Sequence, residues 1–377
     1  MSLKKKFFIT TTIASSLFFF KGQPRLWKNY FDVMVIANEE EKLRVFAETE
    51  GVNFLLMPMR REISLINDFI CLIRFICLFI KERPYIVHGN TPKAGMLSMV
   101  AAWLTKRPVR IYMCHGLRYQ SENGFKRKLL MSFEKLSCFC ATKVICVSSG
   151  VKNKLIGDNL CASRKAKVIG YGTAGGVDIN YFSRTSNYMP VIVTETANSF
   201  VFIFIGRIVR DKGVDELVKA FQRLCDDGYN VYLQLIGSME QDLDPVGLET
   251  LKMIKRNTRI HALGRQSDVR PFLEKSNALI LPSYREGVGQ VLLEACCMDV
   301  PCIASDIIGC NEVIVSGVNG ELVPPRNSEM LYQIMKEWVC NPTKVAKMEK
   351  VCRNSIVERY AQDKVFHAYL DEYLSYL

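Results

Sequence analysis

The sequence lacks the features that would set it apart from ordinary globular proteins. None of its 14 cysteines forms a C-x-x-C pair or has a histidine nearby at the spacing of a zinc site. The chain has only 13 prolines in 377 residues, no low-complexity tract and no repeat at a solenoid period. We therefore expect folded globular domains, with the cysteines as reduced thiols that fill the core.

Apolar runs long enough to cross a bilayer are also missing. The N-terminus, MSLKKKFFITTTIASSLFFFKGQ, resembles a signal peptide, but no small-x-small cleavage site follows its apolar part. Residues 63–80 are very apolar, yet Asp68 and Arg74 interrupt them, which favours a packed or interfacial helix. We expect residues 5–10 to form a buried strand, followed by a loop that reaches Gly22, and no membrane-spanning segment.

Acidic residues are scarce in the first half of the chain. Residues 1–180 hold 28 of the 50 Lys and Arg residues but only 13 of the 38 Asp and Glu residues. Such a basic half suggests an anionic partner: a membrane surface, a phosphorylated substrate or a nucleic acid. A merely soluble basic surface is the alternative. Nucleic acid is the least favoured partner, because the chain has no recognition motif and no basic stripe interleaved with aromatics.

Short apolar runs alternate with helical patterns, and this order restarts after a polar, turn-rich stretch near residue 190. It predicts two α/β domains built from βαβ units around parallel sheets. We place the domains at residues 1–185 and 186–342, and a helical end that packs back on the first domain at 343–377. The expected strands are 5–10, 32–37, 53–58, 86–88, 110–114, 143–147, 200–206, 231–237, 260–264, 277–282 and 301–305. The expected helices include 91–104, 126–140, 214–224, 268–275 and 290–298.

Charged residues follow two strands of the second domain, where ligands of open α/β sheets bind. Arg207 comes after one strand, and Lys212 precedes the next helix. A guanidinium and an ammonium beside a helix N-terminus form an anion site that suits a diphosphate. An ordinary surface junction, where Lys and Arg are common, is the alternative.

Two carboxylates stand eight positions apart in the stretch SYREGVGQVLLEA. Glu286 falls in a glycine loop, and Glu294 falls in the helix that follows, at a position expected to be apolar. Carboxylates are good acceptors for sugar hydroxyls, and a buried Glu needs a partner. A helix-capping Glu with a core Glu is one alternative. A glycosidase pair is another, disfavoured because both acids lie on one loop–helix element.

Taken together, these segments resemble glycosyltransferase family 4, retaining enzymes of the GT-B fold. The resemblance spans essentially the whole chain, with IVHGNTPKAG, MCHGLRYQ, VICVSSGVKNKLI, YGTAGGVDINYF, FIGRIVRDKG, SYREGVGQVLLEA and DIIGCNEVIVSGVNGELVPP in matching order. It implies two Rossmann-like domains whose parallel sheets face each other across a cleft. It also implies a bacterial enzyme that builds capsule, lipopolysaccharide or other glycans on polyprenyl diphosphate.

The resemblance assigns roles to residues at the strand ends. Arg207 and Lys212 would hold the donor diphosphate, Glu286 hydroxyls of the donor hexose and Glu294 the nucleotide ribose. His115 would lie by the transferring sugar, and it forms the expected catalytic set with Arg207, Lys212 and Glu286. Further donor contacts are expected from the backbone at Gly22, Gly287, Val288 and Gly289 and, around the nucleobase, from Gly237 and Asp268.

Three segments depart from the family pattern. The loop usually reads Glu-Gly-Phe-Pro-Asn or similar, whereas this chain has Glu-Gly-Val-Gly-Gln at residues 286–290. A flexible glycine thus replaces a stiff proline, which leaves loop rigidity and donor preference open. The segments HGN (88–90) and GTAGG (172–176) also differ from the commoner forms.

The resemblance implies transfer of a hexose or N-acetylhexosamine from a nucleotide sugar, expected to be UDP-linked, to a lipid-linked saccharide. The implied route is front-face, with the departing phosphate helping to deprotonate the acceptor. No metal or other cofactor is expected. Asp242 and Asp244 form a D-x-D pattern, but they precede Pro245 in a polar loop, where acids cap a helix. A sugar-nucleotide epimerase of the same fold is the alternative enzyme.

The basic first half predicts a cytoplasmic protein docked on the anionic inner face of the plasma membrane. His88 follows an apolar strand and fits a core histidine equally well, while His261 and His367 are expected to be structural. The candidates for acceptor or membrane contact are Arg60, Arg61, His88, Lys93, Lys126, Arg127 and Lys128.

Overall fold

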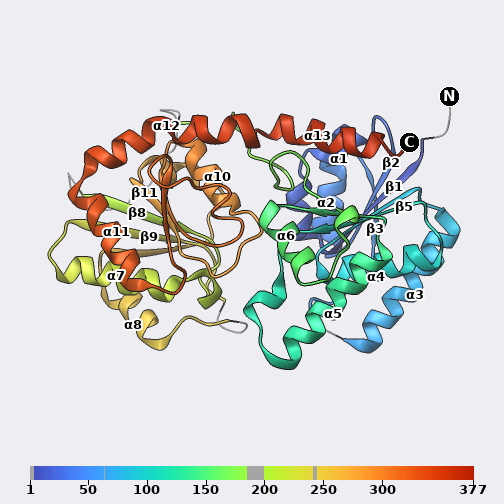
Figure 1. Cartoon of the computed structure of the whole chain (residues 1–377), viewed down its shortest axis with the longest axis horizontal. Coiled ribbons are helices and arrows are strands. Elements are labelled where there is room, and N and C mark those ends of the chain that lie inside the picture. Colours follow the sequence, from blue (N-terminus) through green and yellow to red (C-terminus); the bar gives the residue numbers. More distant parts are fainter. Residues whose placement is uncertain (1–3, 63, 185–198, 241–243) are drawn as a thin grey trace. The chain divides into compact units, whose positions relative to one another are not determined.

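Each half of the chain folds around its own parallel sheet (Figure 1). The computed structural model describes residues 4–62, 64–184, 199–240 and 244–377. One compact unit comprises Met1–Gly175 together with Asp363–Leu377, and the other comprises Gly176–Gln362. Both sheets are parallel and flanked by helices, as expected for two Rossmann-like domains.

The first unit contains a seven-stranded sheet in the order β3-β2-β1-β4-β5-β6-β7. Its central strands β1 and β4 are almost wholly buried, as expected where helices cover both faces of a parallel sheet. The strands are β1 (Lys6–Ile13), β2 (Asp32–Asn38), β3 (Asn53–Leu56), β4 (Ile86–Asn90), β5 (Val109–Cys114), β6 (Lys143–Cys146) and β7 (Ala166–Lys167). The α-helices are α1 (Gln23–Trp27), α2 (Glu40–Glu50), α3 (Leu65–Glu82), α4 (Pro92–Leu104), α5 (Gly124–Cys140), α6 (Ser149–Gly157) and α13 (Gln362–Leu374).

The segment between β1 and Gly22 is not the loop that we expected. It forms a 3₁₀ helix, η1 (Ala14–Phe20), in which Leu17 and Phe20 are buried. Residues three apart lie on the same side of a 3₁₀ helix, so both side chains reach the core together. Among the described residues no helix is both long and apolar enough to cross a bilayer.

The second unit contains a six-stranded sheet in the order β10-β9-β8-β11-β12-β13. Helices α7 and α8 lie on one side of its strands in Figure 1, and α10 and α12 lie on the other. The strands are β8 (Phe200–Ile205), β9 (Val231–Ile236), β10 (Ile260–Gly264), β11 (Ala278–Leu281), β12 (Cys302–Ser305) and β13 (Gly320–Val323). The helices are α7 (Val214–Asp226), α8 (Leu248–Arg256), α9 (Arg270–Glu274), α10 (Gln290–Cys297), α11 (Ser328–Cys340) and α12 (Pro342–Tyr360).

The units divide after Gly175, ten residues before the boundary expected from the sequence. The backbone of the following segment bonds to α12: Val177 N–H donates to Tyr360 O at 2.8 Å, and Arg353 donates to the carbonyls of Ile179 and Phe182. The helical end is also divided between the units. Helix α12 belongs to the second unit, and the chain from Asp363 onward belongs to the first.

Candidate active site

The candidate donor side of the second unit begins where β8 and β9 end. Gly237 follows β9, and a Cβ at this position would overlap the carbonyl oxygen of Gly206, so only glycine fits. Its N–H donates to Gly264 O at 2.9 Å. Gly237 therefore holds three strand ends together, and this packing accounts for the glycine without a nucleobase.

Arg207 projects from the end of β8 and is paired with a carboxylate. Its Nη1 lies 2.9 Å from Glu240 Oε2, and 43% of the Arg207 side chain is exposed. An ion pair this exposed contributes little to stability, so exchanging Glu240 for a bound anion would cost little. Glu240 is a partner that the sequence did not indicate.

Lys212 and Glu286, which lie 74 positions apart, meet at the ends of neighbouring strands. Lys212 Nζ lies 2.5 Å from Glu286 Oε1, and only 20% and 13% of the two side chains are exposed. The segments that carry them are joined again beside this pair, because Asp211 pairs with Arg285 at 2.8 Å and Tyr284 N–H donates to Asp211 O. Lys212 also precedes the N-terminus of α7, so an ammonium and a helix end occur together, as predicted.

The glycine loop after β11 has unused hydrogen-bond donors. No acceptor among the described residues pairs with the backbone N–H groups of Gly287, Val288 or Gly289. The buried hydroxyls of Ser283 and Ser305, at the ends of β11 and β12, also have no hydrogen-bond partner in the described part of the chain. Unpaired polar groups are costly in a folded protein, and they concentrate where a ligand or water completes the structure.

Glu294 is the fifth residue of α10, and its surroundings change the pKa of its carboxyl group. Burial raises the pKa of Glu294 to about 7, while a hydrogen bond from Gln290 opposes that rise. Gln290 in turn donates to Gly176 O at 2.9 Å. Near pH 7 the Glu294 carboxyl can therefore either donate or accept a hydrogen bond from a hydroxyl.

Two acids assigned from the sequence serve the local fold. Asp268 lies before α9 rather than inside the helix expected at 268–275, and it pairs with Arg270 at 2.6 Å. This bond to Arg270 lowers the pKa of Asp268. Asp244 accepts the Asp211 N–H at 2.7 Å. It does not cap the following helix as expected, because α8 begins at Leu248 with Gly247 as its N-cap and has no side-chain cap. Asp242 lies outside the described residues, and the described part of the chain has no cluster of three or more metal-ligating side chains.

His115 follows β5 in the first unit and belongs to a polar network. Its Nε2 lies 3.2 Å from Asn90 Oδ1, and Asn90 Nδ2 lies 2.9 Å from His88 Nδ1. His88 Nε2 is 3.0 Å from the hydroxyl of Tyr373 on α13. His88 is fully buried, so it is not a surface contact for an acceptor or a membrane. Sequence reasoning missed Asn90 and Tyr373, although Asn90 ends the segment HGN.

Gly22 has a structural role that differs from the predicted contact with phosphate. Its φ of 89° favours glycine, and a Cβ there would lie 2.9 Å from the Phe366 ring. Its N–H donates to Glu50 Oε1 at 2.9 Å. A glycine in the sequence does not by itself show whether the position needs a left-handed backbone conformation or a close approach to a ligand.

The predicted surface cations do not all reach solvent. Lys93 is ion-paired with Asp68 at 2.7 Å, and 11% of its side chain is exposed, so it is unsuited to lipid contact. Lys126 pairs with Glu122 but stays largely exposed. The other four cations predicted for membrane contact are exposed: Arg60, Arg61, Arg127 and Lys128.

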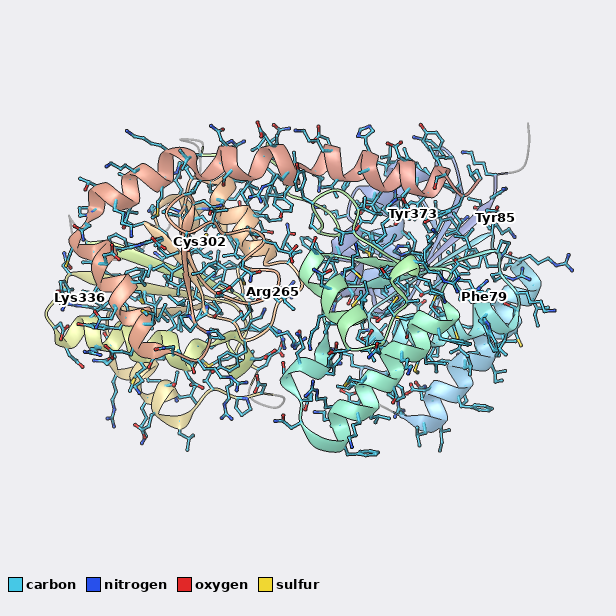
Figure 2. The ribbon with its side chains drawn as sticks, in the orientation of Figure 1. Phe79, Tyr85, Arg265, Cys302, Lys336 and Tyr373 are labelled. Atoms are coloured by element: carbon cyan, nitrogen blue, oxygen red, sulfur yellow. The ribbon has the colours of Figure 1, made fainter. Side chains whose placement is uncertain are left out.

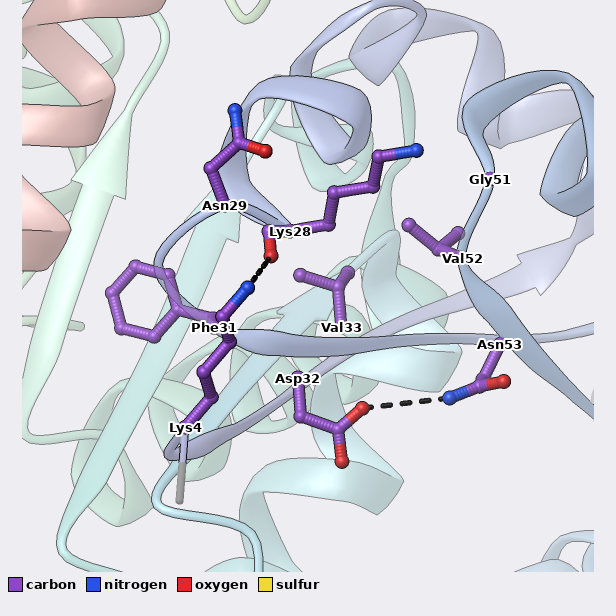
Figure 3. Close-up of a pocket in the computed structure, with 9 residues that line it drawn as sticks. All are labelled: Lys4, Lys28, Asn29, Phe31, Asp32, Val33, Gly51, Val52 and Asn53. Atoms are coloured by element: carbon purple, nitrogen blue, oxygen red, sulfur yellow. Dashed lines mark hydrogen bonds between the residues drawn. The ribbon is translucent and has the colours of Figure 1, made fainter. Parts of the chain in front are cut away.

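An open depression of about 690 Å³ lies at the amino ends of the strands of the first sheet (Figure 3). Lys4 and Asp32 border it at the amino ends of β1 and β2, and Asp32 accepts from Asn53 at 3.4 Å. The predicted site residues lie at the carboxyl ends of the strands. The depression is therefore not part of the candidate active site.

Both halves of the chain match known protein families. Residues 24–173 match the family Glycosyltransferase Family 4, and residues 191–355 match Glycosyl transferases group 1. A capsular polysaccharide biosynthesis glycosyltransferase of Staphylococcus aureus, CapM, is 34% identical over 85% of this chain and 83% of its own length. The UDP-Gal:alpha-D-GlcNAc-diphosphoundecaprenol alpha-1,3-galactosyltransferase of Escherichia coli is 28% identical over 90% and 89%.

A solved structure agrees with these matches at the level of the fold. Anabaena Alr3699/HepE in complex with UDP-glucose superposes with a TM-score of 0.79 at 18% identity, over 99% of this chain and 100% of that one. The GT-B fold predicted from the sequence is confirmed. With two family matches in order and a relative above 30% identity over most of both chains, the chain belongs to glycosyltransferase family 4.

Proposed function

We propose that this glycosyltransferase moves a hexose or N-acetylhexosamine from a UDP sugar to a saccharide on polyprenyl diphosphate, with retention at the anomeric carbon. The Lys212–Glu286 pair supports the proposal, because it puts a cation and an acid that could accept hydrogen bonds from sugar hydroxyls together beside unused backbone N–H groups. The Escherichia coli relative is named for a UDP-Gal donor and a diphosphoundecaprenol-linked acceptor, and the Anabaena structure contains UDP-glucose. We propose that this transfer is a step in the synthesis of a bacterial surface polysaccharide.

In the proposed reaction the bond between the anomeric carbon and the phosphate oxygen breaks while the acceptor oxygen bonds on the same face. The acceptor proton passes to the departing phosphate oxygen. Lys212 and Arg207 stabilise the negative charge that grows on the diphosphate, and Glu286, held by Lys212, orients hydroxyls of the donor hexose. Because two cations supply this stabilisation, we expect the reaction to need no metal ion.

Donor binding tests this proposal without knowledge of the acceptor. Thermal unfolding of the full chain would be followed with UDP-, GDP- and dTDP-sugars, each with excess Mg²⁺ and with a chelator. We expect only the UDP-sugars to raise the Tm, and to raise it equally with Mg²⁺ and with the chelator. A ligand at 100 times its Kd stabilises the folded protein by about 2.7 kcal/mol. A response to GDP- or dTDP-sugars alone would overturn the UDP assignment. A response that needs Mg²⁺ would overturn the metal-free mechanism.

We further propose that the first unit docks on an anionic bilayer at the inner face of the plasma membrane. Helices α3 and α5 both pack against α4, and each exposes large apolar side chains. Leu65 and Ile66 begin α3 and are about four-fifths exposed, as is Phe125 at the start of α5. Exposed cations flank them, namely Arg60, Arg61, Lys126, Arg127 and Lys128. Exposed apolar side chains next to cations are typical of interfacial helices.

Vesicle binding tests this docking surface. The variant Leu65→Asp/Ile66→Asp is expected to bind anionic vesicles at least about tenfold more weakly, because each inserted side chain contributes roughly 1.5–3 kcal/mol. Leu248→Asp is the matched control, since Leu248 is equally exposed but lies on α8 of the second unit. Wild-type binding should weaken as salt rises. Equal binding by wild type and double variant, or binding that salt leaves unchanged, would contradict the docking surface.

A further inference from the structure

We propose that Asn90 is a positioning residue that fixes the tautomer of His115, so that His115 presents the lone pair of Nδ1 to a hydroxyl of the transferring sugar. The contact with the sugar rests on the proposed function. The tautomer itself rests only on the hydrogen bonds within the first unit.

The orientation of the Asn90 amide follows from one acceptor that cannot donate. Asn90 Nδ2 lies 3.2 Å from the backbone carbonyl oxygen of His88 and 2.9 Å from His88 Nδ1. A carbonyl oxygen only accepts, so the atom facing it must be the NH₂ group, whose two hydrogens serve these two acceptors. The amide oxygen therefore faces His115.

This orientation determines which nitrogen of His115 carries the proton. Asn90 Oδ1 accepts but cannot donate, and it lies 3.2 Å from His115 Nε2. His115 Nε2 must then carry a hydrogen. No hydrogen-bond partner for His115 Nδ1 exists among the described residues, which leaves that nitrogen available to a ligand.

The surroundings of His115 keep its ring neutral. Its ring centroid lies 5.0 Å from that of Phe19 and 6.0 Å from that of Phe20. Burial in this setting lowers the pKa of His115 to about 4. A neutral imidazole has one N–H and one lone pair, so with the hydrogen on Nε2 the lone pair is on Nδ1.

The far end of the network is anchored by the C-terminal helix. Because His88 Nδ1 accepts from Asn90, His88 Nε2 carries the hydrogen and donates to Tyr373 Oη at 3.0 Å. Figure 2 shows Tyr373 on α13, and its ring packs edge-on against Phe7 and Trp27 with centroids 5.0 Å away. His88 is thus a rigid support for Asn90, although the residues that bind it lie far apart in the sequence.

Nitrogen NMR on the full chain labelled with ¹⁵N-histidine reads the tautomers directly. The chain has only four histidines, and single His→Gln variants assign their signals. We expect wild-type His115 and His88 to be neutral with the hydrogen on Nε2 at pH 7.5. A hydrogen on Nδ1 of His115, or a doubly protonated ring, would overturn the proposal without any variant. This reading does not depend on whether the chain transfers sugar.

Two variants then separate positioning from general support of the fold. Asn90→Leu is expected to mix the His115 tautomers and to lower kcat about tenfold, with His261 and His367 signals unchanged. Tyr373→Phe is expected to change the His88 signals but to leave the His115 tautomer intact, because the His88 carbonyl still orients Asn90. An unchanged His115 tautomer in Asn90→Leu would overturn the proposal. A change of the His115 tautomer in Tyr373→Phe would also overturn the proposal. It would mean that the hydrogen bond from Asn90 to the His88 carbonyl does not orient the Asn90 amide.

Discussion

Replacing Lys212 with alanine is expected to lower kcat by about 10²–10³-fold, because pre-placed charges are typically the largest catalytic contribution. The ammonium lies 2.5 Å from Glu286, so the change would remove the cation proposed to face the departing diphosphate and would release the acid proposed to orient the hexose. Arg207→Ala should lower kcat about 100-fold with little change in Tm, since its pair with Glu240 is largely exposed. Steady-state transfer rates with saturating donor measure both effects.

Stability measurements distinguish the two roles of Lys212. In Lys212→Ala the poorly exposed Glu286 carboxylate loses its partner, which should destabilise the second unit by about 1–3 kcal/mol. The double variant Lys212→Ala/Glu286→Ala should regain most of that stability and no activity. Lys219→Ala is the matched control, since Lys219 is exposed on α7. A kcat close to that of wild type in Lys212→Ala would contradict the proposed mechanism.

The variant Glu294→Gln is expected to be more stable than wild type above pH 7 and to bind the donor more weakly. Burial raises the pKa of Glu294 to about 7 from an ordinary value of 4.5, so the folded chain binds a proton more tightly than the unfolded chain does. The contribution of Glu294 to stability is therefore favourable at low pH and falls as pH rises from about 4.5 to about 7. Glutamine does not ionise, so at pH 8 the variant should gain about 1–3 kcal/mol.

Unfolding across pH and donor titration test the two halves of this prediction. The stability gain of Glu294→Gln should shrink as the pH is lowered from 7 toward 4.5. Its donor KM should rise about tenfold, because a carboxylate accepts hydrogen bonds from hydroxyls more strongly than an amide does. Glu249→Gln is the control: Lys252 lowers the pKa of this exposed acid, so its removal should bring no gain at high pH. A Glu294→Gln gain that is the same at every pH would contradict the ionisation argument.

The parts of the fold that depend on local pattern could be predicted. Continuous apolar runs such as residues 200–206 located β8, and restarting βαβ units indicated two parallel sheets. The positions of Lys212 and Glu286 at strand ends also follow from this reasoning, whereas their contact depends on β8 and β11 being neighbours in the sheet, which the structure shows. Strand β7 was missed because it has only two residues, and β13 was missed because Gly320 and Glu321 interrupt its apolar pattern.

The parts that depend on distant contacts could not be predicted. Tyr373 meets His88 across 285 positions, and no local pattern marks that contact. Composition identified Lys93 as a cation, but only its pairing with Asp68 explains why it does not face solvent. Gly22 could be recognised as a special backbone position, whereas its bond to Glu50 depends on how α2 packs. Local sequence thus located the strand ends, and tertiary packing determined which side chains there are free to act.

The most direct test is sugar transfer by the purified full chain, with a labelled UDP-sugar and a saccharide on polyprenyl diphosphate supplied together and separately. The account predicts one glycosylated lipid and one UDP per turnover, formed only when both substrates are present, with the anomeric configuration of the donor retained. Conversion of the UDP-sugar without acceptor into an isomeric sugar would contradict it and would identify an epimerase.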